Sequence, residues 1–275
     1  MKKRTIYTKV IIHSVLIVGA IIMILPFIWM CLTSIKTLSE SITVPPILFP
    51  KVPQWHNFVD ILNKLPFLSF YINTIILIIG RVAFALAFSS MAAYAFARIE
   101  FPFREFLFSI VLVQIMIPSQ IFLTPQFLLA QKLGILDSIP GLIFPGLVSA
   151  FGTFLLRQFF KGLPDELEEA AILDGCNIWQ IFFKIMLPLA RSGLVALGIF
   201  TTLFAFKDLM WPLIVNISED KMPLSAGLAS LQGQYSTNYP ELMAGSLLAI
   251  WPMLLIFIMF QKRFIEGIAT SGGKL

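Results

Sequence analysis

The chain has 275 residues, of which 58% are hydrophobic and only 13% are charged, and its mean hydropathy is +0.88. A soluble globular domain carries about 25% charged residues, so roughly half of the charge that a water-exposed surface needs is missing. The composition excludes a soluble enzyme, a disordered chain and a disulfide-stapled secreted module, and it indicates a protein whose main solvent is lipid. The net charge of +5 requires no nucleic acid, because Lys and Arg in a membrane protein first carry orientation information.

The residues that commonly bind metals or catalyse reactions are few and scattered in this chain. Its two cysteines, Cys31 and Cys176, and its two histidines, His13 and His56, each stand alone in the sequence. A structural zinc site or a histidine-based catalytic centre needs clusters of such residues. We therefore predict no catalytic residue, no metal site and no enzyme activity in this chain.

Six apolar runs are long enough to cross a bilayer, which takes about 20 helical residues. They cover residues 10–32, 70–97, 106–129, 139–160, 192–214 and 242–261. The first run is interpreted as a retained span rather than a signal peptide, because it is too long and no small-x-small cleavage site follows it. All six are too uniformly apolar for barrel strands, so we predict an all-α polytopic membrane protein, with residues 1–275 forming a single transmembrane domain.

The placement of Lys and Arg assigns the two sides of the membrane. If the N-terminus is cytoplasmic, thirteen of these residues lie on the cytoplasmic side and five lie outside, while Arg81 and Lys207 fall inside spans. This asymmetry predicts that both termini are cytoplasmic. The outer loop 33–67 contains Pro45, Pro46, Pro50 and Pro53 and is expected to be extended or turn-rich. The outer loop 216–240 is expected to hold a short half-buried or re-entrant piece between the last two spans.

Residues 162–188 carry the most specific signal. Pro164 suits the first turn of a helix, and the acids at 165, 166, 168 and 169 would lie at the positive end of its dipole. Gly175 tolerates a left-handed backbone, so the chain can turn there and start a second helix that runs to Pro188. These signals predict a helix-turn-helix elbow on the cytoplasmic side.

The residue chemistry leaves two interpretations of this elbow open. It is either a docking knob for a soluble partner or a solvated amphipathic connector. In the first case Ala170, Ala171 and Gly175 allow close approach, and the neighbouring acids offer charge-assisted bonds to a partner's Arg. The docking candidates are Glu168, Glu169, Ala170, Ala171, Asp174 and Gly175.

The spacing of the elbow residues favours docking. Glu169-Ala170-Ala171, Gly175, Ile185 and Leu187-Pro188 match in full the EAA loop of bacterial ABC-importer permeases. The whole chain resembles the carbohydrate-type permeases, similar to the smaller maltose-transporter permease. The other matching stretches are Asn73-Thr74, Ala92 to Arg98, Phe154 to Phe160, Leu163 to Leu167 and Trp211-Pro212-Leu213.

This resemblance implies a fold and a set of partners. In the family, six helices pack against a second permease, the elbow is a coupling helix that docks on a dimeric cytoplasmic ATPase, and an external solute-binding protein delivers the substrate. The Gly-rich tail would reach the ATPase through Gly272, Gly273 and Lys274, although a floppy terminus has the same composition. The chain itself lacks G-x-x-x-x-G-K-[ST], so ATP and Mg²⁺ are expected in the ATPase, and no cofactor is expected here. The resemblance also implies a multi-pass protein of the bacterial cytoplasmic membrane.

Polar residues inside the spans are the substrate-path candidates, because a charge at mid-bilayer costs at least about 2.5 kcal/mol. Each has a structural alternative as an interhelical pair or hydrogen bond. Where the family often has Trp-Asn-Asp, this sequence has Phe206-Lys207-Asp208, which leaves room for an anionic group on the substrate. The candidates are Asn73, Arg81, Gln114, Lys207, Asp208 and Trp211.

The function that these observations predict is that of the permease subunit of an ATP-driven importer for a mono- or oligosaccharide, neutral or acidic, which works by alternating access. One alternative is an ion-coupled secondary transporter of a small polar solute. It predicts paired broken helices and inverted repeats, and it gives no reason for the EAA spacing. A membrane enzyme would need a cluster of acids, His or metal ligands at one membrane face, and the only acidic cluster is the elbow.

Overall fold

The computed structural model describes residues 2–233 and 237–272. In these ranges every regular element is helical, apart from one isolated antiparallel bridge between Gln232 and Thr237, which confirms the all-α prediction. The contacts divide the chain into two compact units. The first consists of the chain up to Pro66 and of Leu228–Pro252, and the second consists of Phe67–Gly227 and the chain from Met253 onward.

The first unit contains α1 (Lys2–Ser34), α2 (Leu38–Ile42), α3 (His56–Lys64) and the beginning of α15 (Tyr239–Gly272). The loop 33–67 was expected to be extended or turn-rich, and that expectation is wrong for α2 and α3. A capping box between Thr37 and Glu40 starts α2, which explains why a helix forms before the prolines. The four prolines lie between the two short helices, where no regular structure forms.

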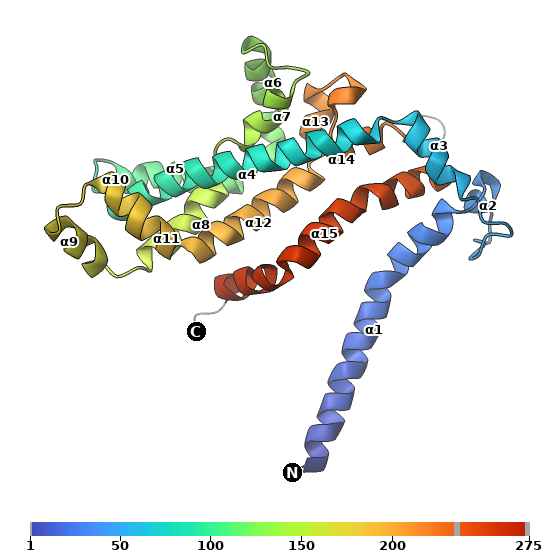
Figure 1. The fold of residues 1–275 in the computed structure, drawn as a ribbon, viewed down its shortest axis with the longest axis horizontal. Coiled ribbons are helices and arrows are strands. Elements are labelled where there is room, and N and C mark those ends of the chain that lie inside the picture. Colours follow the sequence, from blue (N-terminus) through green and yellow to red (C-terminus); the bar gives the residue numbers. More distant parts are fainter. Residues whose placement is uncertain (1, 234–236, 273–275) are drawn as a thin grey trace. The chain divides into compact units, whose positions relative to one another are not determined.

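The second unit is built around α4 (Phe67–Arg98), with α8 (Ala150–Lys161) and α12 (Arg191–Lys207) lying alongside it (Figure 1). Close approach of these helices depends on Gly152, where an added Cβ would lie 2.7 Å from Ser89 Oγ and 2.9 Å from a methyl carbon of Leu197. Small residues at such points let helix backbones approach closely in lipid. The three helices therefore form the body to which the functional elements attach.

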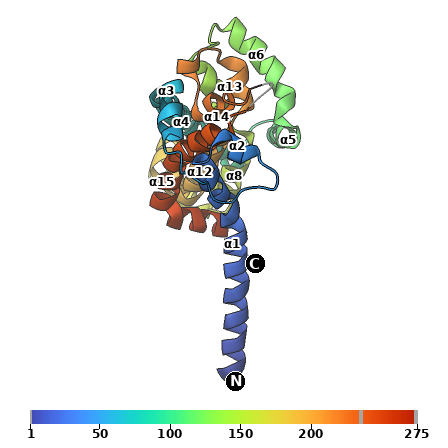
Figure 2. The ribbon, with the colours of Figure 1, turned by 90° about the vertical axis from the view of Figure 1, so that its right-hand side faces the viewer.

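One predicted span is sharply bent. The run 106–129 was expected to be a single span, but α5 (Arg104–Met116) is followed by η1 (Ser119–Phe122) and α6 (Leu123–Lys132) at an angle of 103°. Figure 2 shows α5 nearly end-on and α6 along its length. Pro118 explains the bend, since it lacks a backbone donor and holds Ile117 in an extended conformation with ψ 128°.

Two further predicted spans are interrupted. The run 139–160 is divided into α7 (Ile139–Ile143) with η2 (Phe144–Gly146), and then α8 at 46°. The run 192–214 ends early, because α12 stops at Lys207 and α13 (Met210–Val215) is separate. The described residues thus hold three unbroken helices of membrane-spanning length and composition, Tyr7–Ser34, Phe67–Arg98 and Tyr239–Gln261, or up to six spans if each bent pair is one span.

The segment that follows α13 contains the short half-buried piece that was expected in the loop 216–240. It contains η4 (Glu219–Lys221) and α14 (Leu224–Ala229), and Leu224, Ala226 and Gly227 on α14 are buried. The half-buried piece is therefore α14.

Candidate functional sites

The elbow, residues 162–188, follows the end of α8. It contains α9 (Glu166–Leu173), α10 (Ile178–Ile181) and a π-helical turn, η3 (Phe182–Met186), and it leads into α11 (Leu187–Leu189). Glu166, Glu168 and Glu169 occupy the first turn of α9, where carboxylates interact favourably with the helix dipole. The predicted helix-turn-helix is therefore present, and it lies at one end of α4 (Figure 1).

Gly175 makes the turn between the two helices of the elbow. Its φ is +79°, its N–H donates to the carbonyl oxygen of Ile172 at 3.0 Å, and the N–H of Cys176 donates to that of Ala171 at 2.9 Å. These two bonds form a Schellman motif, which closes α9. An added Cβ at Gly175 would meet nothing within 4 Å, so a side chain there is strained by the backbone and causes no clash.

The second helix of the elbow is fixed at its start and along one face. Asn177 and Gln180 form a capping box, with N···O distances of 2.9 and 2.8 Å. Phe182, which follows α10, is buried, with its ring centroid 5.2 Å from that of Tyr94 on α4 and 6.5 Å from that of Phe160 on α8. The elbow is therefore packed against α4 and α8 through this core.

The opposite face of the elbow is exposed and mixes acids with apolar side chains. Leu173 is 88% exposed, and its neighbour Ile172 on α9 is 62% exposed. Glu169 and Asp174 are exposed beside them. Apolar side chains gathered at an exposed projection are typical of a surface that a partner covers.

Glu168 differs from its neighbour Glu169. Its side chain is only 15% exposed, and its Oε2 lies 3.7 Å from Arg98 Nη1. Of the two adjacent glutamates, Glu169 is therefore exposed, whereas Glu168 faces Arg98 at the end of α4.

A polar cavity of about 630 Å³ lies at the junction of α4, α5–α6 and the break between α12 and α13. Its amide and hydroxyl groups come from the bent segment around Pro118, and its charged groups come from α4 and from the end of α12. Such groups can both donate and accept hydrogen bonds, as sugar hydroxyls require. The polar residues that line it are Arg81, Gln114, Ser119, Gln120, Gln126, Lys207 and Asp208.

The two cationic side chains of this cavity have different partners. Arg81 donates from Nε and Nη2 to the carbonyl oxygen of Leu142, at 3.2 and 2.8 Å, and its Nη1 lies 2.8 Å from Asp208 Oδ2. Lys207 is exposed, lies 5.3 Å from the Phe204 ring centroid, and belongs to none of the ion pairs found among the described residues. Arg81 is thus committed to structure, whereas the Lys207 ammonium remains available to a ligand.

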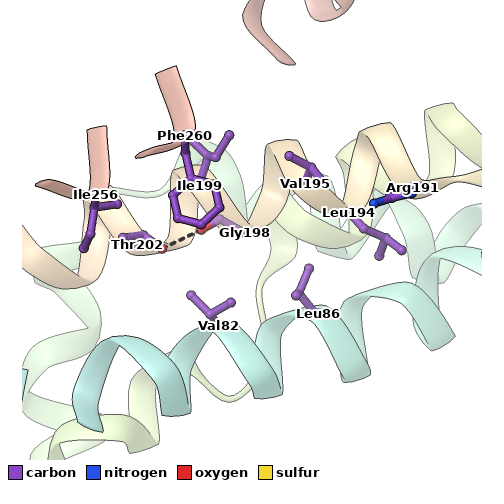
Figure 3. Close-up of a pocket in the computed structure, with 10 residues that line it drawn as sticks. All are labelled: Val82, Leu86, Arg191, Leu194, Val195, Gly198, Ile199, Thr202, Ile256 and Phe260. Carbon is purple, nitrogen blue, oxygen red and sulfur yellow. Dashed lines mark hydrogen bonds between the residues drawn. The ribbon is translucent and has the colours of Figure 1, made fainter. Parts of the chain in front are cut away.

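A second pocket, of about 330 Å³, has a different character (Figure 3). It lies between α4, α12 and the α15 residues Ile256 and Phe260, and its lining is apolar apart from Arg191 and Thr202. The Thr202 hydroxyl already donates to the carbonyl oxygen of Gly198 at 2.8 Å. This pocket offers few hydrogen bonds to a sugar, so the polar cavity is the better candidate for a substrate path.

Residues 85–269, which include the elbow and the charged end of α12, match the family model described as "Binding-protein-dependent transport system inner membrane component". The chain belongs to this family. The resemblance found from the EAA spacing is thereby confirmed, and the chain is a multi-pass component of a bacterial inner-membrane transport system.

Curated members of the family cover nearly the whole chain. The arabinooligosaccharides transport system permease protein AraQ of Halalkalibacterium halodurans is 37% identical over 93% of this chain and 92% of its own. The diacetylchitobiose uptake system permease protein NgcG of Streptomyces coelicolor is 31% identical over 94% and 87%. The sn-glycerol-3-phosphate transport system permease protein UgpE of Pectobacterium atrosepticum is 31% identical over 94% and 95%.

A solved structure shows the same fold. A chain of a bacterial ABC transporter involved in the import of the acidic polysaccharide alginate superposes with a TM-score of 0.79 at 23% identity, over 95% of this chain and 98% of that one. The polytopic helical fold predicted for this family member is therefore shown.

Five of the six substrate-path candidates of this permease line the polar cavity: Arg81, Gln114, Lys207, Asp208 and Trp211. Of these, Trp211 is buried, and its indole N–H donates to the carbonyl oxygen of Gly141 at 2.9 Å. Asn73 does not line the cavity, because its amide donates to the carbonyl oxygens of Asp220 and Met222. Lys207 and Asp208 were expected within the fifth span, but Lys207 ends α12 and Asp208 follows it.

The elbow candidates divide into exposed and buried residues. Glu169, Ala170, Asp174 and Gly175 are exposed, Glu168 is half-buried, and Ala171 of α9 is buried. For the tail, Gly272 is the last residue of α15, and Gly273 and Lys274 lie outside the described residues.

Sequence reasoning missed two residues of this permease that connect segments far apart in the chain. Arg98, which ends one of the stretches that match the family, bonds to the elbow. Asp137 joins the α6–α7 loop to the segment after α13, since it accepts hydrogen bonds from the Ser218 hydroxyl at 2.6 Å and from Lys221 Nζ at 3.0 Å. These bonds, with those from the backbone N–H groups of Ser218 and Ile217, hold the pKa of the Asp137 carboxyl well below its usual range. Asp137 has a positive φ of +50°, which the sequence pattern did not indicate.

Proposed function

We propose that this chain is the permease subunit of an ATP-driven importer of saccharides, in which the elbow receives the force of a dimeric cytoplasmic ATPase. The observation that carries the proposal is the exposed acidic and apolar face of the elbow, at Glu169, Leu173 and Asp174. An exposed apolar projection on a transport subunit needs a partner, and its carboxylates suit an Arg or Lys of that partner.

The remaining parts of the system belong to other chains. A second permease would complete the transmembrane pathway, an external solute-binding protein would deliver the substrate, and ATP and Mg²⁺ would bind the ATPase. Both termini and the elbow would lie in the cytoplasm, as the charge asymmetry predicts. Catalysis is not assigned to this chain, because its role is to move between inward-open and outward-open states.

A saccharide is the substrate class that the relatives favour. AraQ and NgcG are named for an oligosaccharide and a chitobiose derivative, and the polar cavity supplies amides suited to hydroxyl groups. UgpE and the alginate importer are named for anionic solutes, and Lys207 offers this chain an unpaired cation at the cavity. These observations support an acidic saccharide as the finer proposal.

The test is uptake by the complete complex in proteoliposomes, with the binding protein outside and ATP inside. The solutes offered are an arabinooligosaccharide, diacetylchitobiose, an alginate oligosaccharide and sn-glycerol-3-phosphate. We expect ATP-dependent uptake of at least one saccharide, insensitive to ionophores. Uptake that collapses with the ion gradient and ignores ATP would contradict the proposal and favour an ion-coupled transporter.

The acidic preference is tested with Lys207→Asn. Loss of this cation should lower uptake of an anionic solute by about tenfold and leave a neutral solute within about twofold, since a charged contact contributes about 1.5–3 kcal/mol. Gln126→Ala serves as the control, because it removes a neutral lining group from the same cavity. Equal uptake of every solute by Lys207→Asn and the wild type would contradict the role of Lys207.

A further inference from the structure

Arg98 lies at the last position of α4, and its side chain is only 7% exposed. Its Nε and Nη2 donate to the carbonyl oxygen of Phe160, at 3.1 and 2.6 Å, and its Nη2 also donates to that of Leu163. Its Nη1 forms ion pairs with Asp165 and with Glu168. One guanidinium group therefore contacts four residues that are more than sixty positions further along the chain.

These four residues belong to two helix ends. The carbonyl groups of Phe160 and Leu163 lie at and just beyond the end of α8, where a helix leaves carbonyl oxygens without intrahelical partners and attracts cations. Asp165 and Glu168 lie at the beginning of α9, the first helix of the elbow. Arg98 thus joins the end of α4 to the end of α8 and to the start of the elbow.

The same α4 helix carries Arg81, which pairs with Asp208 and lines the polar cavity. Arg98 lies seventeen positions after Arg81 on this unbroken helix, a distance of about 25 Å at 1.5 Å per residue. The long helix α4 (Figure 1) therefore bonds to the elbow through Arg98 and to the cavity wall through Arg81.

We propose that Arg98 is a positioning residue that fixes the elbow to α4, so that displacement of the elbow moves α4 and, through it, the Arg81–Asp208 pair at the cavity. The proposal rests on the function proposed above and names the contact through which this chain transmits the movement. A guanidinium suits this task because its planar fork can bond carbonyl and carboxylate groups at once, which the ammonium of Lys cannot do.

The experiment compares Arg98→Gln and Arg98→Lys with the wild type in the proteoliposome complex. The readouts are the amount of assembled complex, the rate of ATP hydrolysis, and the number of ATP molecules hydrolysed per arabinooligosaccharide or alginate oligosaccharide imported. Arg98→Gln should keep the exposed elbow face, assemble with the ATPase and hydrolyse ATP, while the ATP used per solute rises by about tenfold, within the usual range of coupling between sites. Arg98→Lys should recover part of the loss, because it keeps the charge and loses the fork.

Arg104→Gln is the matched control. This arginine is partly exposed, and its ion pair is with the adjacent Glu105, so its loss should leave the ATP-to-solute ratio unchanged. If Arg98→Gln does not assemble, the ATP-to-solute ratio is measured in the double variant Asp165→Asn/Glu168→Gln instead. This variant leaves Arg98 bonded to α8 and removes only its ion pairs with α9. A wild-type ratio in Arg98→Gln or, failing its assembly, in the double variant would overturn the proposal. If the wild-type complex imports neither these two solutes nor diacetylchitobiose with ATP, the proposed function is contradicted, and this inference, which rests on it, is contradicted as well.

Discussion

Arg81 and Arg98 lie on the same helix and bond to the same kinds of group, yet their surroundings differ. Both side chains are almost fully buried, at 9% and 7% exposure, and each donates to a backbone carbonyl and pairs with a carboxylate. The acid beside Arg81, Asp208, is 23% exposed, whereas Asp165 beside Arg98 is 80% exposed. Arg81 also lies well inside the apolar span, and Arg98 ends it.

The difference in exposure gives the two arginine–carboxylate pairs different roles. Water can replace Asp165 beside Arg98, so loss of that ion pair costs little stability and acts mainly on the position of the elbow. Water and lipid replace Asp208 poorly beside Arg81, so loss of that acid leaves an uncompensated charge inside the span. We infer that the Arg81 region mainly maintains the fold, and that the Arg98 region mainly maintains the transmission of movement.

The largest effect is expected at the Arg81 region. Asp208→Ala should destabilise the folded chain by about 3–5 kcal/mol, because it removes one partner of a buried ion pair and leaves the other charged. The measurement is the thermal unfolding midpoint of the purified complex in detergent, together with the amount of protein inserted in the membrane.

The neighbouring Lys207→Ala serves as the control for Asp208→Ala, since Lys207 is exposed and joins none of the ion pairs among the described residues. It should leave the midpoint unchanged. The double variant Arg81→Met/Asp208→Ala should recover part of the lost stability, because both charges are then gone. Equal midpoints for Asp208→Ala and Lys207→Ala would remove the distinction between the two arginines.

A smaller effect on stability, with a clear effect on transport, is expected at the elbow. Gly175→Ala places a Cβ on a backbone with φ +79° and should cost about 1 kcal/mol, enough to shift the Schellman turn and tilt α9. Uptake should fall while the amount of inserted protein stays near wild type. Gly175→Asn should retain more uptake, because Asn tolerates this conformation.

Gly162→Ala is the matched control, because this glycine lies in the same elbow with φ −83° and an added Cβ would make only ordinary contacts at 3.5 Å. It should leave uptake unchanged. Equal uptake by the Gly175→Ala and Gly162→Ala variants would show that the geometry of the turn does not matter for transport.

Local signals in the sequence predicted α4 and the elbow well. The bounds of α4 differ from the predicted 70–97 by three residues at the start and one at the end, because a long apolar run ending in a charge leaves few alternatives. Gly175 at the turn was also predictable, since a helix stop needs a residue that tolerates positive φ. Both features depend on residues close together in the chain.

The bends and the long-range pairs were not predicted. Pro118 was visible in the sequence, but hydropathy over the run 106–129 hid the break, since both sides of the proline are equally apolar. The Arg81–Asp208 pair joins residues 127 positions apart, and the elbow contacts of Arg98 join residues more than sixty apart. Such pairs depend on how helices pack, which periodicity and composition do not encode. Asn73 shows the same limit, because its amide could bind either a substrate or a neighbouring loop.

The central claim, that the elbow receives the ATPase, is tested most directly by Glu169→Lys in the purified complete complex. Glu100→Lys, which makes the same change at an exposed acid outside the elbow, is measured beside it. ATP hydrolysis stimulated by the loaded binding protein and uptake are followed in one preparation. We predict normal insertion of both variants, loss of uptake with weakened ATPase binding or unproductive hydrolysis in Glu169→Lys, and wild-type behaviour in Glu100→Lys. Wild-type uptake and wild-type stimulation in Glu169→Lys would contradict the account and leave the elbow a connector.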